Sequence, residues 1–205
     1  METHSSDMIS IDYLYVQVIP FHQSLTTNYK IRTIESLRSK KKPNGKDEVD
    51  QSKRAINVYH ARKITIIQLN GDDKFGVMVE AIRPTPVNIV GAGEHIGNIE
   101  RSNRTVEERP KCHVYCLPFK FYPTEMVCSY VIKVVKDLNM EIASDVVSKD
   151  LSPGTLITGR INPSYKEIMA LNFGDYVQAH VSALKTNNNE SRTTGCIALY
   201  LSRNG

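Results

Sequence analysis

Two short runs of β-branched and aromatic residues constrain the fold of this chain most strongly. Residues 9–19 are rich in Ile, Val and Tyr, and residues 64–69 form a compact apolar run. Both runs have the composition and length of buried strands, and we expect Pro20 to end the first one. A helical pattern over 47–63 separates them, with acidic residues in its first turn and basic residues in its last. This order of strand, helix and strand predicts a mixed α/β layer rather than a helical bundle.

Further elements extend this pattern along the chain. Residues 26–37 alternate in polarity and predict one or two more strands, and residues 87–90 predict another short strand. Residues 94–115 predict a loop and then a helix, which Pro110 should kink or end. The clearest helical pattern covers 124–140, and its wide apolar face is either part of the core or a subunit contact.

A polar connection and two later strands complete the predicted organisation. The connection contains Ser152-Pro153-Gly154, and residues 173–181 and 195–201 predict the two strands. Two strands alone are marginal in water, so we expect this last unit to be cut short or to lean on the first. The expected parts are a first domain over 1–147, a linker over 148–172 and a partial C-terminal β unit over 173–205.

Composition excludes several classes of protein. The chain has 205 residues and an apolar fraction of 40%, which allows a sizeable core, but it has no apolar run long enough to cross a membrane. The first ten residues are polar and do not form a secretory leader. We therefore expect an intracellular protein, in the nucleus or the cytoplasm, with no membrane partner. The net charge of +4 permits a polyanionic partner without requiring one.

The four cysteines are expected to be reduced thiols, because they lack the spacing of a disulfide framework. Cys112, His113 and Cys116 are close together in the sequence, which raises the alternative of a metal site. A structural zinc site needs four ligands, and no second pair follows. Ordinary packing of these thiols is the stronger interpretation.

Polar residues with the chemistry of a catalytic site stand at or near the ends of these elements. Asp12 lies in the first apolar run, and Asn70 closes the second one. Glu100 lies in the first turn of a predicted helix, and Asn103 and Arg104 follow one turn later on the same face. Together the first three residues have the pattern of an acidic metal-binding triad in which the middle carboxylate is an amide.

Several segments of this chain resemble, in the same order, the integrases of copia-type retrotransposons. The run Glu94-His95-Ile96-Gly97-Asn98-Ile99-Glu100-Arg101 is similar to the family's Glu-His-Val-Gly-Asp-Ile-Glu-Arg. The other similar segments are 12–21, 69–72, 151–159, 173–180 and 192–199. The resemblance implies an RNase H-like mixed sheet flanked by helices, followed by a truncated small β unit.

The resemblance also implies the chemistry of DNA integration, which uses Mg²⁺ or Mn²⁺ to join polynucleotides. Asp12, Asn70 and Glu100 would occupy the catalytic positions, with Asp12 and Glu100 as metal ligands. Asn70 keeps a carbonyl oxygen but has no charge, so metal binding and strand transfer should be absent or strongly reduced. Asp72 lies close in sequence, but we expect Gly71 to turn the chain away from the site.

DNA, or alternatively RNA, is the partner that the resemblance implies, and a homo-oligomer is the implied assembly. Contacts with the phosphate backbone would make binding salt-dependent. For the three lysines, the alternative to a specific phosphate contact is a solvated basic loop with no binding role. The residues expected to make these contacts are Arg101, Asn103, Arg104, Lys40, Lys41 and Lys42.

Three functions stay open on the sequence alone. The first is an active or partly active integrase, and the second is a decayed or repurposed integrase domain that binds DNA or RNA without cutting it. The third is a fragment that associates only with itself or with a partner. Asn70 and Pro110 favour the second and third functions over the first. Salt-dependent DNA binding without cleavage would select the second, and an absence of binding at low salt would select the third.

Overall fold

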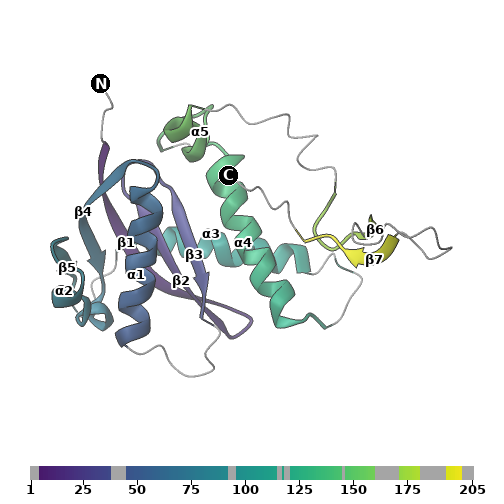
Figure 1. Cartoon of the computed structure of the whole chain (residues 1–205), viewed down its shortest axis with the longest axis horizontal. Helices are drawn as coiled ribbons and strands as arrows, with labels where there is room; N and C mark the ends of the chain where they lie inside the picture. The colour runs from purple at the N-terminus through teal and green to yellow at the C-terminus, as the bar shows by residue number, and fades with distance from the viewer. Residues whose placement is uncertain are drawn as a thin grey trace, which may run out of the picture.

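In the computed structural model, the chain folds around a mixed sheet with helices on both of its faces (Figure 1). The structure describes residues 5–37, 45–91, 96–114, 117, 121–144, 146–159, 171–180 and 193–199. Within them, five strands form the main sheet in the order β3-β2-β1-β4-β5. The strands are β1 (Ser5–Val16), β2 (Ile19–Thr26), β3 (Arg32–Ser36), β4 (Ile64–Gly71) and β5 (Val87–Ile89). β1 is central, antiparallel to β2 and parallel to β4. The predicted α/β fold class is confirmed.

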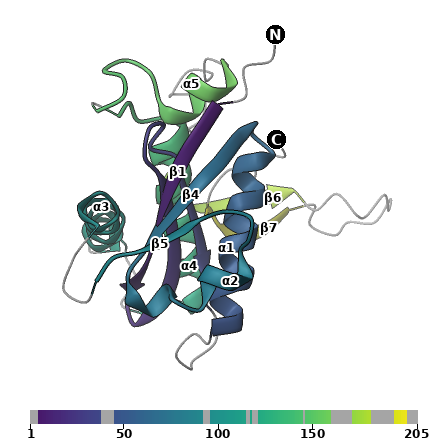
Figure 2. The same ribbon diagram turned by 90° about the vertical axis from the view of Figure 1, so that its left-hand side faces the viewer.

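Helices cover both faces of this sheet. Figure 2 shows α1 on one side of it and α3 on the other. The helices are α1 (Gly45–His60), the 3-10 turn η1 (Asp73–Phe75), α2 (Met78–Ala81), α3 (Gly97–Val114), α4 (Thr124–Met140) and α5 (Pro153–Thr158). None of the helices in the described residues has the length and apolar character needed to cross a membrane.

The first two strands form a tight hairpin that the sequence pattern does not predict. In place of the expected single strand over 9–19, β1 ends at Val16 and β2 contains Pro20. Gln17 and Val18 form the turn, with φ angles of 47° and 61°. A two-residue hairpin turn requires such left-handed backbone, for which Gly and Asn are the usual signals. The expectation that Pro20 ends the first strand is therefore wrong. The sequence did not signal the turn, because the turn contains neither Gly nor Asn.

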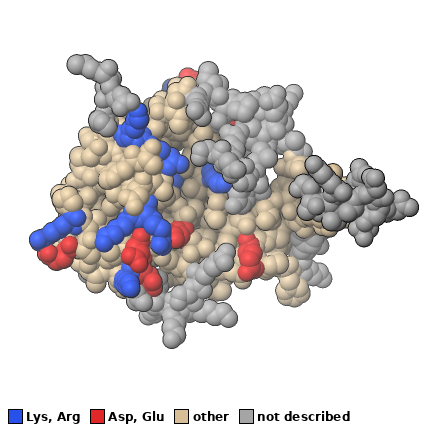
Figure 3. All heavy atoms as spheres, in the orientation of Figure 1, with Lys and Arg blue, Asp and Glu red and all other residues tan. Residues whose placement is uncertain are grey.

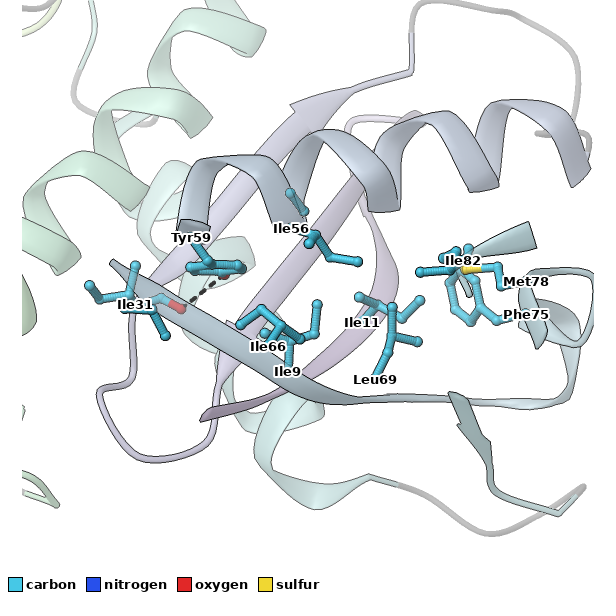
Figure 4. Packing of buried hydrophobic residues seen from close by; sticks show 12 residues of the cluster. Ile9, Ile11, Ile31, Ile56, Tyr59, Ile66, Leu69, Phe75, Met78 and Ile82 are labelled. Atoms are coloured by element: carbon cyan, nitrogen blue, oxygen red, sulfur yellow. Dashed lines mark hydrogen bonds between the residues drawn. The ribbon is translucent and has the colours of Figure 1, made fainter. Parts of the chain in front are cut away.

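The larger core lies between the sheet and α1 (Figure 4). Alternate residues of β1 and β4 point into it and meet one face of α1. Tyr59 is fully buried there, and its hydroxyl donates to the Ile31 carbonyl at 3.3 Å and lies 2.7 Å from Ser24 Oγ. These contacts join α1 to β2 and to the segment before β3. The deeply buried members of this core include Ile9, Ile11, Ile64, Ile66, Leu69, Phe75 and Met78.

The second core lies on the opposite face of the sheet, under α3 and α4. Leu14 and Val16 of β1 pack there against Val106 of α3 and the apolar face of α4. That face of α4 is therefore core, which decides between the two alternatives that its pattern left open. α3 does not end at Pro110, contrary to one expectation, and it runs on to Val114. Pro110 lacks an N–H and removes one helical bond, but its buried ring packs near the end of the helix.

A short helix interrupts the range that was predicted to be a linker. α5 begins after Ser152, whose side chain accepts from the Thr155 N–H at 3.2 Å. Pro153 fits the first turn, and Gly159, with φ of 64°, ends the helix. Two further strands, β6 (Tyr176–His180) and β7 (Thr193–Ile197), pair antiparallel as a separate sheet. The domain boundaries at 147 and 172 stay a prediction.

Side chains from three elements join this small sheet to the helical face. The His113 ring stacks on Tyr130 with centroids 4.8 Å apart, and its Nε2 lies 3.0 Å from the Phe173 carbonyl oxygen. His113, which belongs to α3, therefore contacts both α4 and the segment that leads into β6. His113, which stands beside Cys112 in the sequence, thus has a role in packing.

His22 is a buried base whose protonation should destabilise the fold. Its side chain is 1% exposed and lies against the Tyr13 and Phe75 rings. Burial, helped by the charge of Arg54, lowers the pKa of His22 to about 4, against 6.5 for an unperturbed histidine. The unfolded chain therefore takes up the proton first, and stability is full above pH 6.5 and falls towards pH 4.

We predict that the free energy of unfolding drops by up to about 3 kcal/mol over this range because of His22. Urea denaturation at several pH values should show a flatter profile for His22→Gln. The exposed His60 is the matched control, and His60→Gln should keep the wild-type slope. Identical slopes for His22→Gln and the wild type would contradict the assignment.

Candidate functional site

The central strand places Asp12 on the face of the sheet that α3 covers. Ile9 and Ile11 point to the α1 side, so Asp12 and Leu14 point the other way. Asn70 shares this face, because it pairs with Ser10 in the parallel register between β1 and β4. Neighbouring parallel strands thus bring positions 12 and 70 to one face of the sheet.

The Asp12 carboxylate is held by three donors. Its Oδ1 accepts from Lys74 Nζ at 2.9 Å and from the Tyr13 backbone N–H at 2.7 Å. Its Oδ2 accepts from Asn103 Nδ2 at 2.8 Å. Asn103 is 8% exposed and belongs to α3, so this bond ties the helix to the central strand. Of the expected site residues, Asp12 and Asn103 are therefore in direct contact.

Asn70 is engaged by other amides on the same face of the sheet. Its Oδ1 accepts from Gln68 Nε2 at 2.7 Å and from Asn88 Nδ2 at 3.1 Å. Asn88 is the register partner of Asn70 on β5, which explains their proximity. The carbonyl oxygen of Asn70 is the atom that it could offer to a cation, and two amide donors already use it.

Glu100 lies in the first turn of α3, one turn before Asn103, and its side chain is exposed. Arg101 and Arg104 are also exposed on this helix, and neither forms an ion pair within the part of the chain that the structure describes. The predicted contacts Lys40, Lys41 and Lys42 lie outside the described residues.

The arrangement around Asp12 does not fit a divalent metal ion. Mg²⁺ needs several oxygen ligands in near-octahedral geometry. No group of three or more His, Cys, Asp or Glu side chains could hold a metal ion among the described residues. Asp12 is occupied by an ammonium, an amide and a backbone N–H, and the Asn70 oxygen is occupied by two amides.

Sequence reasoning missed Lys74 as a site residue and set Asp72 aside. Against the expectation that Gly71 turns the chain away from the site, Lys74 Nζ lies 2.8 Å from Asp72 Oδ2 as well as 2.9 Å from Asp12 Oδ1. A Cβ at position 71 would lie 3.1 Å from Phe75, so Gly71 lets η1 fold back against the strand end. The lack of a side chain at this glycine therefore brings Asp72 and Lys74 to Asp12.

A second group of cations lies where α3 meets the start of β3. Arg32 Nε donates to Ser102 Oγ at 2.8 Å, and its Nη1 donates to the Lys30 carbonyl at 3.1 Å. Burial lowers the pKa of Arg32 to about 10, and the charge of Arg109 adds to this effect. Burial also lowers the pKa of Lys30, where Asp7 opposes the shift and Arg32 and Arg101 add to it. We call these residues the basic cluster: Lys30, Arg32, Arg101 and Arg109.

The basic cluster concentrates positive charge at this junction. None of its four members forms an ion pair in the described part of the chain. The charges of Arg32 and Arg101 lower the pKa of Lys30, and the charge of Arg109 lowers that of Arg32. Such a group is stabilised by an anion that neutralises it.

Solved structures with a similar fold are catalytic cores of retroviral integrases. The crystal structure of the catalytic core domain of BIV integrase matches with a TM-score of 0.54 and 11% identity, over 74% of this chain and 93% of that chain. The HTLV-2 integrase catalytic core domain, in a dimeric form in complex with magnesium, gives a TM-score of 0.49 and 14% identity, over 69% of this chain and 90% of that chain. No family model and no curated protein matches the sequence. The likeness to the BIV domain shows the fold, and the predicted RNase H-like architecture is confirmed.

The bond between Asp12 and Asn103 predicts a measurable coupling. In a double-mutant cycle with Asp12→Ala and Asn103→Ala, we expect a coupling of about 1.5–3 kcal/mol in urea denaturation, as for hydrogen bonds to charged groups. Arg104 is exposed and adjacent, so a cycle of Asp12→Ala with Arg104→Ala is the matched control and should be near zero. A coupling with Asn103 no larger than this control would contradict the contact.

Proposed function

We propose that this chain is an integrase-like domain that binds nucleic acid, DNA in the first instance, without cutting or joining it. The observation that carries the proposal is that the Asp12 carboxylate, within an integrase-core fold, is already bonded to other side chains of the protein. Its carboxylate is bonded to Lys74 and Asn103, while the neighbouring catalytic position is an amide, Asn70. Asp12 and position 70 thus share one face of the sheet, but neither offers a free carboxylate there.

The altered charge supports a loss of catalysis. Attack on a phosphodiester builds negative charge that has to be neutralised at the reacting phosphate. Of the three expected catalytic positions, Asn70 supplies no charge and Asp12 is neutralised within the protein by Lys74. Glu100 is the remaining carboxylate of the three, so these positions would hold a divalent ion more weakly than three free carboxylates would.

The distribution of cations supports binding of a polyanion on the α3 side. Arg101 and Arg104 are exposed there, and the basic cluster lies at the junction of α3 with β3. On the face seen in Figure 3, basic side chains lie beside acidic ones, and α3 also carries Glu100, Glu107 and Glu108. Arg54 pairs with Glu35 at 2.8 Å, and Arg83 pairs with Glu80 at 2.7 Å. Cations without an ion-pair partner are the ones available to phosphates.

Other parts of the resemblance remain proposals. They are a homo-oligomeric state, a location in the nucleus or cytoplasm, and phosphate contacts by Lys40, Lys41 and Lys42. The apolar face of α4 is buried in the core, so an oligomer would need another surface.

The DNA-binding proposal predicts a salt-dependent affinity that depends on α3. Fluorescence anisotropy of labelled duplex DNA at increasing salt should give a linear decrease in log K. Replacing Arg101 and Arg104 by Ser should reduce the magnitude of the slope by about 0.9 for each phosphate that the protein then leaves unneutralised. Arg54→Ser together with Arg83→Ser is the matched control away from α3 and should leave the slope unchanged. An absence of binding at low salt, or an equal reduction in both double variants, would contradict the proposal.

The loss of catalysis predicts no product from labelled DNA ends in Mg²⁺ or Mn²⁺. The wild type should give no more cleaved or joined DNA than Asp12→Asn, because its Asp12 is already neutralised. Gel analysis of both proteins beside Glu100→Gln checks this. Product that the wild type forms and both variants lose would show an active enzyme instead.

A further inference from the structure

Lys74 sits between two carboxylates at the end of the central strands. Its Nζ lies 2.9 Å from Asp12 Oδ1 and 2.8 Å from Asp72 Oδ2, so one ammonium bridges both acids. The three residues come from β1 and from the turn that follows β4. Without the ammonium, the Asp12 and Asp72 carboxylates would face each other across the space that it fills.

Aromatic rings hold the same ammonium from another direction. Lys74 Nζ lies 5.2 Å from the centre of the Tyr13 ring and 5.4 Å from that of Phe75. Both distances are within the range of cation–π attraction. Phe75 is fully buried in the core under α1, which anchors η1 and hence Lys74. The position of the ammonium is thus fixed by two charges, two rings and a buried neighbour.

The charge of Lys74 is stable at this position. Two carboxylates contact its Nζ, and two aromatic rings lie within the range of cation–π attraction. Each of these contacts favours the ammonium form, so the lysine is held as a cation beside Asp12.

A divalent ion at Asp12 would need the oxygens that Lys74 uses. Coordination requires lone pairs of Asp12 and of at least one neighbour, at distances that exclude a bound ammonium. The Asn70 oxygen is bonded to Gln68 and Asn88, so it offers no substitute. A metal ion could reach Asp12 only after Lys74 had left and the repulsion between the two positive charges had been overcome.

We propose that Lys74 is an internal counter-ion that takes the place of a divalent metal ion at Asp12 and keeps this site closed to metals. The proposal rests on the proposed function only for the comparison with a metal-dependent integrase core. It assigns a positioning role to Lys74: the lysine neutralises Asp12 and Asp72 and thereby fixes the ends of β1 and β4. It also implies that a latent cation site, formed by Asp12 and Asp72, lies beneath the lysine.

Mn²⁺ titration of the whole chain tests this proposal, with free Mn²⁺ followed by electron paramagnetic resonance. We expect the wild type and Asp12→Asn to bind Mn²⁺ equally weakly. Lys74→Met keeps the side-chain stem and removes the charge, so it should gain one Mn²⁺ with an affinity at least about tenfold above that of the wild type. Its thermal midpoint should fall without Mn²⁺ and rise with it, since two carboxylates then face each other. Lys74→Met combined with Asp12→Asn should lose the gained site.

Lys53, exposed on α1, supplies the matched control, and Lys53→Met should behave like the wild type. The proposal is overturned if wild-type protein binds Mn²⁺ in a manner that Asp12→Asn abolishes. It is equally overturned if folded Lys74→Met binds no more Mn²⁺ than the wild type. Should Lys74→Met fail to fold, the comparison of the wild type with Asp12→Asn still decides.

Failure of this inference differs from failure of the proposed function. Mn²⁺ bound at Asp12 of the wild type would overturn the role of Lys74 while salt-dependent DNA binding could persist. Absence of DNA binding would overturn the proposed function and leave the Mn²⁺ results unchanged.

Discussion

The charge of Asp12 has to be balanced, because it lies on the central strand and is largely enclosed by α3 and by the turn after β4. A carboxylate in such a position is costly unless donors and opposite charges surround it. In this chain the balance comes from Lys74, Asn103 and the Tyr13 N–H. These bonds join β1 to α3 and to the turn after β4.

The contacts that neutralise Asp12 also bear on the proposed function. The fold brings Asp12 of β1, Asn70 at the end of β4 and Asn103 of α3 to one side of the sheet. An amide stands at position 70, and the ammonium of Lys74 forms an ion pair with Asp12. Meanwhile Arg101, Arg104 and the basic cluster keep positive charge on the α3 side. In the function that we propose, this side of the molecule attracts phosphates without cutting or joining DNA.

Much of the fold is predictable because its signals are local. The apolar run that forms β4 and the helical patterns of α1 and α4 are long and periodic, and the structure contains all three elements. The hairpin at Gln17 and Val18 escapes prediction because its left-handed turn contains neither Gly nor Asn. The continuation of α3 through Pro110 escapes it because this depends on a ring buried by tertiary packing.

The candidate site is predictable only in part, for a related reason. Asp12, Asn70 and Asn103 stand out by the resemblance, and the sheet register places the first two on one face. Lys74 does not stand out, because its bond to Asp12 spans 62 positions and depends on the close approach of Phe75 to Gly71. No periodicity or composition encodes that approach.

The most direct test of the central claim is a crystal structure of the unaltered chain grown with Mn²⁺, with anomalous scattering used to locate the ion. We predict that Lys74 Nζ is bonded to both Asp12 and Asp72, with no anomalous peak between them. A peak coordinated by Asp12, with Lys74 displaced from it, would contradict the claim.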